Sequence, residues 1–383
     1  MADPQVLQLR VEKLVAGGDA LAFHEGKAVF VPLALPGELV RAELRRSRRD
    51  FAQASLLEVL EPSPLRAPPE CPIYGACGGC NLQHLAYPAQ LEAKAAIVAE
   101  AFRRTGGIEL GELEVRPSPP FGYRNRMQLH RSPRGRVGFM RRSSAEIVEA
   151  PGCPVAVAPI ADWIAERAAG SGGLEGLGGP GGAGRFLAFG YGGELWLEGR
   201  RDLVEVAVAG QAIRFRLASF FQSNLQLLER FVPEALAGLG GGSAADLYCG
   251  VGLFGAFLAR RFERVCCVEQ DPAALGLARA NVGAAGAEYH ALAVEDWVRG
   301  PGSGKRFDCV LVDPPRSGLG APVRAWLKRS KPPLLVYVSC DPVTLARDAA
   351  DLLAGGFALE SLAAYDFYPQ TGHVECHARF VRA

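Results

Sequence analysis

Residues 246–255 read DLYCGVGLFG, an apolar strand that runs into a glycine turn and then into a helix. Gly250 and Gly252 allow the backbone to approach a ligand closely at the carboxyl end of that strand. From about residue 244 onward the chain alternates strands with helices, which predicts a doubly wound, Rossmann-like α/β domain. The predicted strands are AADLYCG, RVCCVEQ, FDCVLVDPP, PLLVYVSCD and CHARFVR, and the predicted helices are LFGAFLARRF, PAALGLARANV, PVRAWLKRS and VTLARDAADLLAGG.

Acidic residues follow successive strands of this domain. Glu269 ends the second strand, 17 residues beyond Gly252, where a carboxylate can accept hydrogen bonds from both ribose hydroxyls. Asp296 follows the third strand, where it can meet an adenine edge, and Asp313 ends the fourth. Each acid alone fits a helix cap or a turn, but their shared register favours a nucleotide-type cofactor. Gly-x-Gly alone is a weak signal, and among nucleotide-type cofactors we favour S-adenosylmethionine over NAD.

Cys340 is the candidate nucleophile. It lies in VYVSCDPVTLARD (336–348), where an apolar strand ends and a helix begins that Asp341 or Thr344 can cap. A thiol near a helix N-terminus has a lowered pKa, so we expect a reactive thiolate near neutral pH. A buried structural cysteine is the competing interpretation, and we apply it to three cysteines inside strands, Cys266, Cys267 and Cys309.

Glu375 is the candidate general base. It lies near Thr371 and His373 in YPQTGHVECHARF (368–380), although taken alone it fits a surface charge at a strand start better. A thiolate and a base beside a methyl donor fit pyrimidine chemistry. The thiolate adds to C6 and makes C5 nucleophilic, C5 takes the methyl group, the base removes the C5 proton, and the thiolate is expelled.

Three cysteines lie within ten residues in CPIYGACGGC (71–80), and APGCPV supplies Cys153 as a fourth. Soft thiolates select zinc or an iron–sulfur cluster, and the spacing alone does not separate the two. The spacing differs from the C-x3-C-x2-C of radical enzymes, so we expect a structural or RNA-orienting role.

No signal peptide and no run of 18 apolar residues occur, which predicts a soluble cytoplasmic protein without a membrane span. Its ten cysteines should then be thiols or metal ligands rather than disulfides.

The sequence divides into three predicted domains. Residues 1–62 carry short alternating strands and the basic stretch RAELRRSRRD, which favours a small β-barrel with a phosphate-contacting edge. Residues 63–215 form a β-rich central domain, whose helix at 87–105 can pack on the catalytic domain, residues 216–383. Between residues 115 and 145 eight arginines occur without an acid, a candidate phosphate-binding stripe, although the net charge is only +1. These are Arg116, Arg124, Arg126, Arg131, Arg134, Arg136, Arg141 and Arg142.

Seven stretches together resemble the RNA (uracil-5-)-methyltransferase family. They are CGGCNLQHLAYPAQLEAK, YRNRMQL, FFQSNLQLLERFV, DLYCGVGLFG, DPPRSGL, YVSCDPVTLARD and YPQTGHVE. The resemblance implies methylation of uracil C5 in RNA, with Cys340 as nucleophile and Glu375 as general base. It implies S-adenosylmethionine contacts from Gln222, Tyr248, Leu253, Glu269, Asp296 and Asp313. It also implies a four-iron, four-sulfur (4Fe-4S) cluster held by Cys71, Cys77, Cys80 and Cys153. HEGKAVFVPLALPGELV, near the N-terminus, resembles a TRAM domain, an OB-like RNA-binding barrel.

Two positions depart from the family pattern. Asp341 stands where Asn is usual after the nucleophile, and Gln370 stands where His is usual before T-x-H-V-E. An added carboxylate raises the pKa of a neighbouring thiol unless Asp341 is paired or caps the helix. Neither change removes a reacting group, so the expected activity stands.

The barrel together with the cluster favours 23S ribosomal RNA as the substrate of a monomeric enzyme, with the tRNA T-loop as the alternative. Two other classes stay open. DPPR is also similar to adenine-N6 methyltransferases, which need no cysteine nucleophile. A non-catalytic RNA-binding assembly factor would keep the fold alone, and intact Cys340, Glu375 and cofactor acids argue against it.

Overall fold

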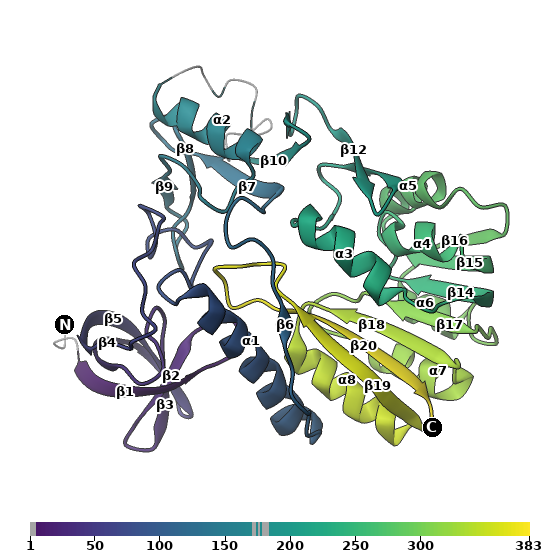
Figure 1. Cartoon of the computed structure of the whole chain (residues 1–383), viewed down its shortest axis with the longest axis horizontal. Helices are drawn as coiled ribbons and strands as arrows, with labels where there is room; N and C mark the ends of the chain where they lie inside the picture. The colour runs from purple at the N-terminus through teal and green to yellow at the C-terminus, as the bar shows by residue number, and fades with distance from the viewer. Residues whose placement is uncertain (1–4, 171–173, 175–176, 178–183) are drawn as a thin grey trace.

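The computed structural model describes residues 5–170, 174, 177 and 184–383. Figure 1 shows three parts: a purple barrel at the N-terminus, a blue-to-teal central region, and a larger green-to-yellow α/β domain at the C-terminus. In this described part of the chain, no helix is both long and apolar enough to cross a membrane.

The N-terminal part is a closed barrel of five strands in the order β1-β2-β3-β5-β4. Alternate side chains of each strand, such as Leu9 and Val11, fill the interior, because successive residues of a strand point to opposite faces. This strand order is that of an OB-like barrel, so the predicted fold of this domain is confirmed. The strands are β1 (Val6–Leu14), β2 (Ala20–His24), β3 (Lys27–Val31), β4 (Leu39–Ser47) and β5 (Phe51–Glu61).

The central region is a five-stranded antiparallel sheet in the order β11-β10-β7-β8-β9, covered by helix α2 (Ala158–Ala168). Trp163 of that helix packs edge-on against Phe186, with ring centroids 5.9 Å apart, and both rings are buried. The cysteine loop of residues 71–80 lies along this sheet, since Gly78 N donates to Met140 O at 2.9 Å. The strands are β7 (Arg126–Arg131), β8 (Val137–Met140), β9 (Ile147–Glu149), β10 (Arg185–Tyr191) and β11 (Glu194–Leu197).

The C-terminal domain is built on a sheet in the order β16-β15-β14-β17-β18-β20-β19-β6. The first five of these strands are parallel, and β20 runs antiparallel between β18 and β19, so the predicted Rossmann-like fold is confirmed. The strands are β14 (Gly241–Leu247), β15 (Phe262–Glu269), β16 (Ala287–Ala291), β17 (Cys309–Val312), β18 (Leu334–Ser339), β19 (Phe357–Tyr365), β20 (Glu375–Arg382) and β6 (Val115–Arg116).

Helices cover both faces of this sheet, because its strands are apolar on both sides. Helices α3, α4 and α5 share one buried cluster with one face, and α6, α7 and α8 share a second cluster with the other. Their bounds are α3 (Leu225–Ala235), α4 (Leu253–Leu258), α5 (Pro272–Val282), α6 (Val294–Arg299), α7 (Ala321–Ser330) and α8 (Pro342–Ala354).

The packing does not follow the predicted boundary between residues 215 and 216. The hairpin β12 (Leu203–Val208) and β13 (Gln211–Arg216) buries alternate side chains such as Val206 and Phe215 in the catalytic core. Helix α1 (Tyr87–Ala101) and the π-helical turn η1 (Phe102–Gly106) pack on the opposite face, as the expected helix contact requires. Short β6 joins the catalytic sheet by pairing in parallel with β19.

Candidate functional site

A cavity of about 560 Å³ opens at the carboxyl ends of the parallel strands, beside the point where strand order reverses between β14 and β17. Ligands of open α/β sheets bind at this crevice. We call it the reaction cavity. Its lining includes Gln222, Tyr248, Leu253, Glu269, Asp313, Cys340 and Glu375, all of them predicted site residues.

Three neighbouring strands bring the reacting side chains together. Asp313 directly follows β17, and Cys340 directly follows β18. Strand β20 begins at Glu375 and pairs with β18 in a register that sets Ser339 opposite Cys376. One step further along this antiparallel ladder, Cys340 comes opposite Glu375, so two residues 35 positions apart share one end of the cavity.

Burial governs the charge of this cluster. Glu375 is only 4% exposed, which overturns its reading as a surface charge. Burial raises the pKa of Glu375 well above its usual range, Asp313 raises it further, and the Arg316 guanidinium opposes both effects. Burial likewise raises the pKa of Asp313 to about 7.

The expected lowering of the Cys340 pKa is wrong for the protein by itself. Burial, followed by the carboxyl groups of Glu375 and Asp313, raises the pKa of this thiol to about 11, although Arg316 lowers it. The helix N-terminus is close, but burial and, after it, two nearby carboxyl groups outweigh a partial dipole charge. Cys340 therefore needs an additional positive charge to become a thiolate near neutral pH.

The departure at Asp341 has a local explanation. Its carboxylate Oδ1 accepts from the backbone N–H groups of Val343 at 2.9 Å and Thr344 at 3.0 Å, which makes it the N-cap of α8. The sequence left Asp341 and Thr344 as alternative caps of α8, and in the structure Asp341 is the cap. Its carboxylate is stabilised there by two backbone N–H groups.

The glycine turn after β14 shapes the cofactor side. Gly252 has a φ of +79°, and a Cβ there would lie 2.9 Å from atoms of Ala278, so only glycine lets α4 and α5 pack this closely. Glu269 braces the turn, because its carboxylate accepts from Gly250 N at 3.1 Å and from Asp271 N at 2.8 Å. Its remaining lone pairs face the cavity, where a ribose could donate to them.

Asp296 is not brought into the cavity with the other acids. It lies on α6, its side chain is 68% exposed, and it pairs with Arg299 at 3.5 Å. Its neighbour Glu295 lines the cavity instead and accepts from the Tyr248 hydroxyl at 2.9 Å. Successive residues of a helix point about 100° apart, so two adjacent acids do not face the same way. Which of them faces the cavity depends on the residue at which the helix begins, and the sequence did not predict that residue.

Gln222 has an orphaned polar atom. Its side chain is buried in the cavity wall, and its Oε1 lacks a hydrogen-bond partner among the described residues. A buried acceptor of this kind is costly unless a ligand donates to it, so the wall fits a bound polar cofactor or base. Phe220, two residues earlier, lines the same cavity and is 68% exposed, a residue that sequence reasoning missed.

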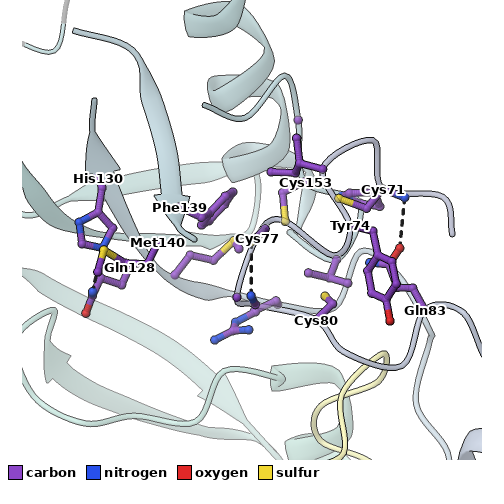
Figure 2. A pocket seen from close by; sticks show the side chains of 18 residues that line it. Cys71, Tyr74, Cys77, Cys80, Gln83, Gln128, His130, Phe139, Met140 and Cys153 are labelled. Atoms are coloured by element: carbon purple, nitrogen blue, oxygen red, sulfur yellow. Dashed lines mark hydrogen bonds between the residues drawn. The ribbon is translucent and has the colours of Figure 1, made fainter. Parts of the chain in front are cut away.

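A second enclosed space, of about 240 Å³, lies in the central region, and we call it the cysteine pocket. Figure 2 shows the sulfur atoms of Cys71, Cys77, Cys80 and Cys153 around this space, with Phe139 and Met140 at its edge. The fourth thiol comes from the segment after β9, as the sequence predicted. Burial raises the pKa of Cys153 to about 12, and the Cys80 thiol adds to the effect.

The spacing of these thiols bears on which metal fits. Sulfur atoms around one tetrahedral zinc lie about 3.8 Å apart, because each Zn–S bond is about 2.3 Å long. Among the described residues, the groups of three ligand atoms within 4.8 Å of one another are Asp246, Cys249 and Cys267, and Cys266, Glu288 and His290. The four thiols of the cysteine pocket are not among these groups, and four cysteines are a donor set that both a zinc ion and an iron–sulfur cluster can take.

The arginine-rich segment does not form one unopposed stripe. Three of its arginines pair with Glu234, Glu149 and Glu146, which lie outside the segment: Arg116, Arg136 and Arg141. Three others donate to backbone carbonyls: Arg124, Arg126 and Arg142. Arg131 and Arg134 are exposed and have no side-chain partner among the described residues. The segment is therefore partly structural, and the acids that balance it come from elsewhere in the chain.

The parallel sheet, its glycine turn and the acids around the reaction cavity define a methyltransferase that uses S-adenosylmethionine. The sequence models of the families described as tRNA (Uracil-5-)-methyltransferase and Methyltransferase small domain match residues 303–382 and 222–325.

Full-length relatives identify the family. The chain is 34% identical to the 23S rRNA (uracil(1939)-C(5))-methyltransferase RlmD of Aeromonas salmonicida, over 98% of this chain and 97% of that protein. It is 30% identical to an uncharacterized RNA methyltransferase of Treponema denticola, over 96% and 97% respectively. The tRNA (uracil-54, C5)-methyltransferase of Pyrococcus abyssi, solved with S-adenosyl-L-homocysteine, is similar with a TM-score of 0.76 and 27% identity, covering 98% of this chain and 100% of that chain. The chain belongs to the RNA (uracil-5-)-methyltransferase family.

Proposed function

We propose that this protein forms 5-methyluridine in 23S ribosomal RNA, with Cys340 as nucleophile and Glu375 as general base. One observation carries the proposal: a thiol and a buried carboxyl group lie at adjacent strand ends in a cavity whose other end has a cofactor turn. Adenine-N6 chemistry requires no such thiol, and a non-catalytic assembly factor requires neither group.

The side chains divide the reaction between them. Cys340 Sγ adds to C6 of the uracil, which places electron density on C5; S-adenosylmethionine supplies the electrophilic methyl group that C5 takes. Glu375 then removes the C5 proton, C5–C6 becomes a double bond again, and the sulfur leaves as thiolate. Gln222, Tyr248, Leu253, Glu269 and Asp313 line the cavity where the cofactor would bind, and Glu295 is a stronger candidate contact than Asp296.

The raised pKa values support this division. Glu375 and Asp313 share a buried site with Cys340, so the three groups do not readily hold three negative charges together. A cationic sulfonium in the same cavity lowers the pKa of each group, because an opposite charge favours the ionised form. The thiolate would then form when the methyl donor is bound, which limits reaction of Cys340 with other electrophiles.

The choice of ribosomal RNA rests on the relatives. The Aeromonas protein that this chain matches over nearly its full length is named for 23S rRNA, whereas the Pyrococcus structure is named for tRNA. The decisive measurement is mass mapping of 5-methyluridine in RNA from a strain that lacks the gene. Loss of one 5-methyluridine from 23S rRNA is the expected result, and loss from the tRNA T-loop with unchanged ribosomal RNA would assign the alternative substrate.

We further propose that the cysteine pocket holds a 4Fe-4S cluster and that the N-terminal barrel acts as a TRAM domain. The four thiols that line one space support the cluster, and it would tie the cysteine loop to the central sheet. Protein purified without oxygen should be brown and contain about four irons per chain. Colourless protein loaded with zinc would refute this assignment.

A further inference from the structure

The loop between β19 and β20, residues 366–374, leads directly into Glu375. Figure 1 shows this yellow loop extending out of the catalytic domain toward α1 and the N-terminal barrel. We call it the base loop. The catalytic sheet supports only its two ends, so its middle depends on contacts from the rest of the chain.

Asn81 makes the most direct of these contacts. Its Oδ1 accepts from Gly372 N at 2.9 Å, and its Nδ2 donates to Gly17 O of the barrel at 2.6 Å. The backbone N–H groups of Asn81 and Leu82 both donate to Gln370 O, at 3.0 and 2.9 Å. The Asn81 side chain thus links the barrel to the base loop at Gly372, which lies three positions before Glu375.

The approach of barrel and base loop leaves no room for a side chain. Gly17 and Gly372 form an isolated antiparallel bridge. A Cβ built on Gly372 would lie 2.4 Å from Gly18 N and 2.5 Å from Gly17 C, closer than folded proteins allow. The two backbones therefore touch, and Asn81 closes the contact from the side.

Helix α1 holds the other side of the base loop. Gln90 and Gln370 exchange two hydrogen bonds, Gln90 Nε2 to Gln370 Oε1 and Gln370 N to Gln90 Oε1, each 2.9 Å. Lys94 Nζ meets Asp366 Oδ1 at 2.5 Å, and both side chains are fully buried. The residue at 370 is an amide because it completes this reciprocal pair, which accounts for the second departure from the family pattern.

Asn81 is also the residue next to a cysteine of the pocket. Cys80 directly precedes it, and Arg142 Nη2 donates to Cys80 O at 2.7 Å, which fixes the peptide between the cysteine and Asn81. We propose that Asn81 is a positioning residue through which the cysteine loop, held in place by its metal, fixes the base loop and hence Glu375. This inference rests on the proposed function, because it assigns a task to the general base of that reaction.

The first test separates positioning from folding. Asn81→Ala should lower kcat about 10- to 100-fold, since small misplacement of a reacting group has effects of this size, with the KM for RNA and cofactor affinity nearly unchanged. Asn81→Asp keeps the acceptor for Gly372 N and should retain more kcat than Asn81→Ala. Gln90→Ala removes the bonds to Gln370 and also those from Gln90 Nε2 to Leu82 O and Leu85 O, and it should show the same fall in kcat. Gln8→Ala, on the exposed face of β1, serves as the matched control.

The second test does not depend on activity. Hydrogen–deuterium exchange of peptides that cover residues 366–376 should be slow in the iron-loaded protein and faster after the iron is removed by a chelator. In Asn81→Ala this exchange should be faster than in the wild-type protein and respond less to iron, because the side-chain bonds to Gly372 and Gly17 are lost and only backbone contacts remain. Unchanged exchange in peptides from β14 and α5 would show that the catalytic domain stays folded.

The outcomes are distinguishable. If wild-type protein methylates no uracil while exchange follows the iron, the proposed function fails and the coupling stands. If base-loop exchange is the same with and without iron, or if Asn81→Ala keeps wild-type kcat, the inference is overturned whatever the substrate.

Discussion

The cysteine pocket and the reaction cavity each present thiols to an enclosed space, and in both places burial raises the thiol pKa. In the pocket the next contribution comes from another thiol, as for Cys153 beside Cys80. In the reaction cavity it comes from carboxyl groups, since Glu375 and Asp313 raise the pKa of Cys340. Each site thus collects groups that become anionic together only when a cation is present.

The difference lies in which cation each arrangement suits. Four thiols around one space offer a complete ligand set, so metal bound there has no open position for chemistry. One thiol beside two carboxyl groups offers no such set, but it leaves the sulfur free to attack a substrate. The proposed function therefore makes the crowded cysteines structural and the single cysteine reactive.

The largest effect should come from removing the single cysteine. Cys340→Ala should reduce methylation by more than about 10⁴-fold and abolish the covalent adduct with RNA, because no other group supplies the nucleophile. Cofactor binding, measured by calorimetry, should remain. Cys77→Ala, by contrast, should lose bound iron while it keeps measurable methylation activity. Methylation by Cys340→Ala would contradict the assignment of Cys340 as the nucleophile.

Glu375→Gln should separate addition from proton removal. The amide cannot accept the C5 proton, so turnover should fall roughly 10²- to 10⁴-fold, the range typical of a lost general base. Addition by Cys340 does not need that step, so a methylated covalent adduct with RNA should accumulate and be visible on a denaturing gel. A variant that turns over slowly without any adduct would place the base elsewhere in the reaction cavity.

Much of this arrangement could be predicted from the sequence. Strand ends are predictable, and Asp313, Cys340 and Glu375 are each found one residue from a strand boundary. Strand β19 escaped prediction, because its side chains are mostly half-buried at the edge of the sheet and give a weak pattern. Spacing along the chain located three of the pocket cysteines, and the resemblance to the family added Cys153 as the fourth.

The electrostatics could not be predicted in the same way. The sequence placed Cys340 at a helix N-terminus and so suggested a lowered pKa, but burial in the folded chain raises it, and carboxyl groups next to two other strands add to that effect. The prediction of one unopposed arginine stripe failed for the same reason, because Glu234 and Glu146, which lie outside that segment, pair with two of its arginines. Charge balance is a property of the folded neighbourhood, and a local stretch of sequence does not contain it.

The thiol pKa offers a smaller but more specific test. With a pKa raised to about 11, Cys340 should react with iodoacetamide about 100-fold more slowly at pH 7 than a thiol with the ordinary value of 9, and the rate should rise tenfold per pH unit. S-adenosylmethionine should accelerate the reaction relative to S-adenosylhomocysteine, because only the former carries a positive sulfonium. Peptide mass spectrometry would follow Cys340, with the pocket cysteines as internal controls that respond to iron instead.

The smallest effects should come from the arginines, and here the structure separates two kinds. Arg131 and Arg134 are exposed without a side-chain partner among the described residues, so they are free to contact phosphate. Arg126 instead donates from its guanidinium to Leu217 O at 2.8 Å and Ser219 O at 3.3 Å, which joins the central sheet to the segment before α3. Replacing the first two by alanine should weaken RNA binding and reduce the salt slope by about one unit per lost phosphate contact.

Arg126→Ala is the matched comparison for that pair. It should lower the melting temperature, because the carbonyl groups of buried Leu217 and half-buried Ser219 lose their donor, yet it should leave the salt slope of RNA binding almost unchanged. Filter binding at several salt concentrations, with thermal melts on the same preparations, measures both quantities. If Arg126→Ala flattens the salt dependence and the double variant does not, the RNA path follows the junction between the central sheet and the catalytic domain rather than the outer face of the central sheet.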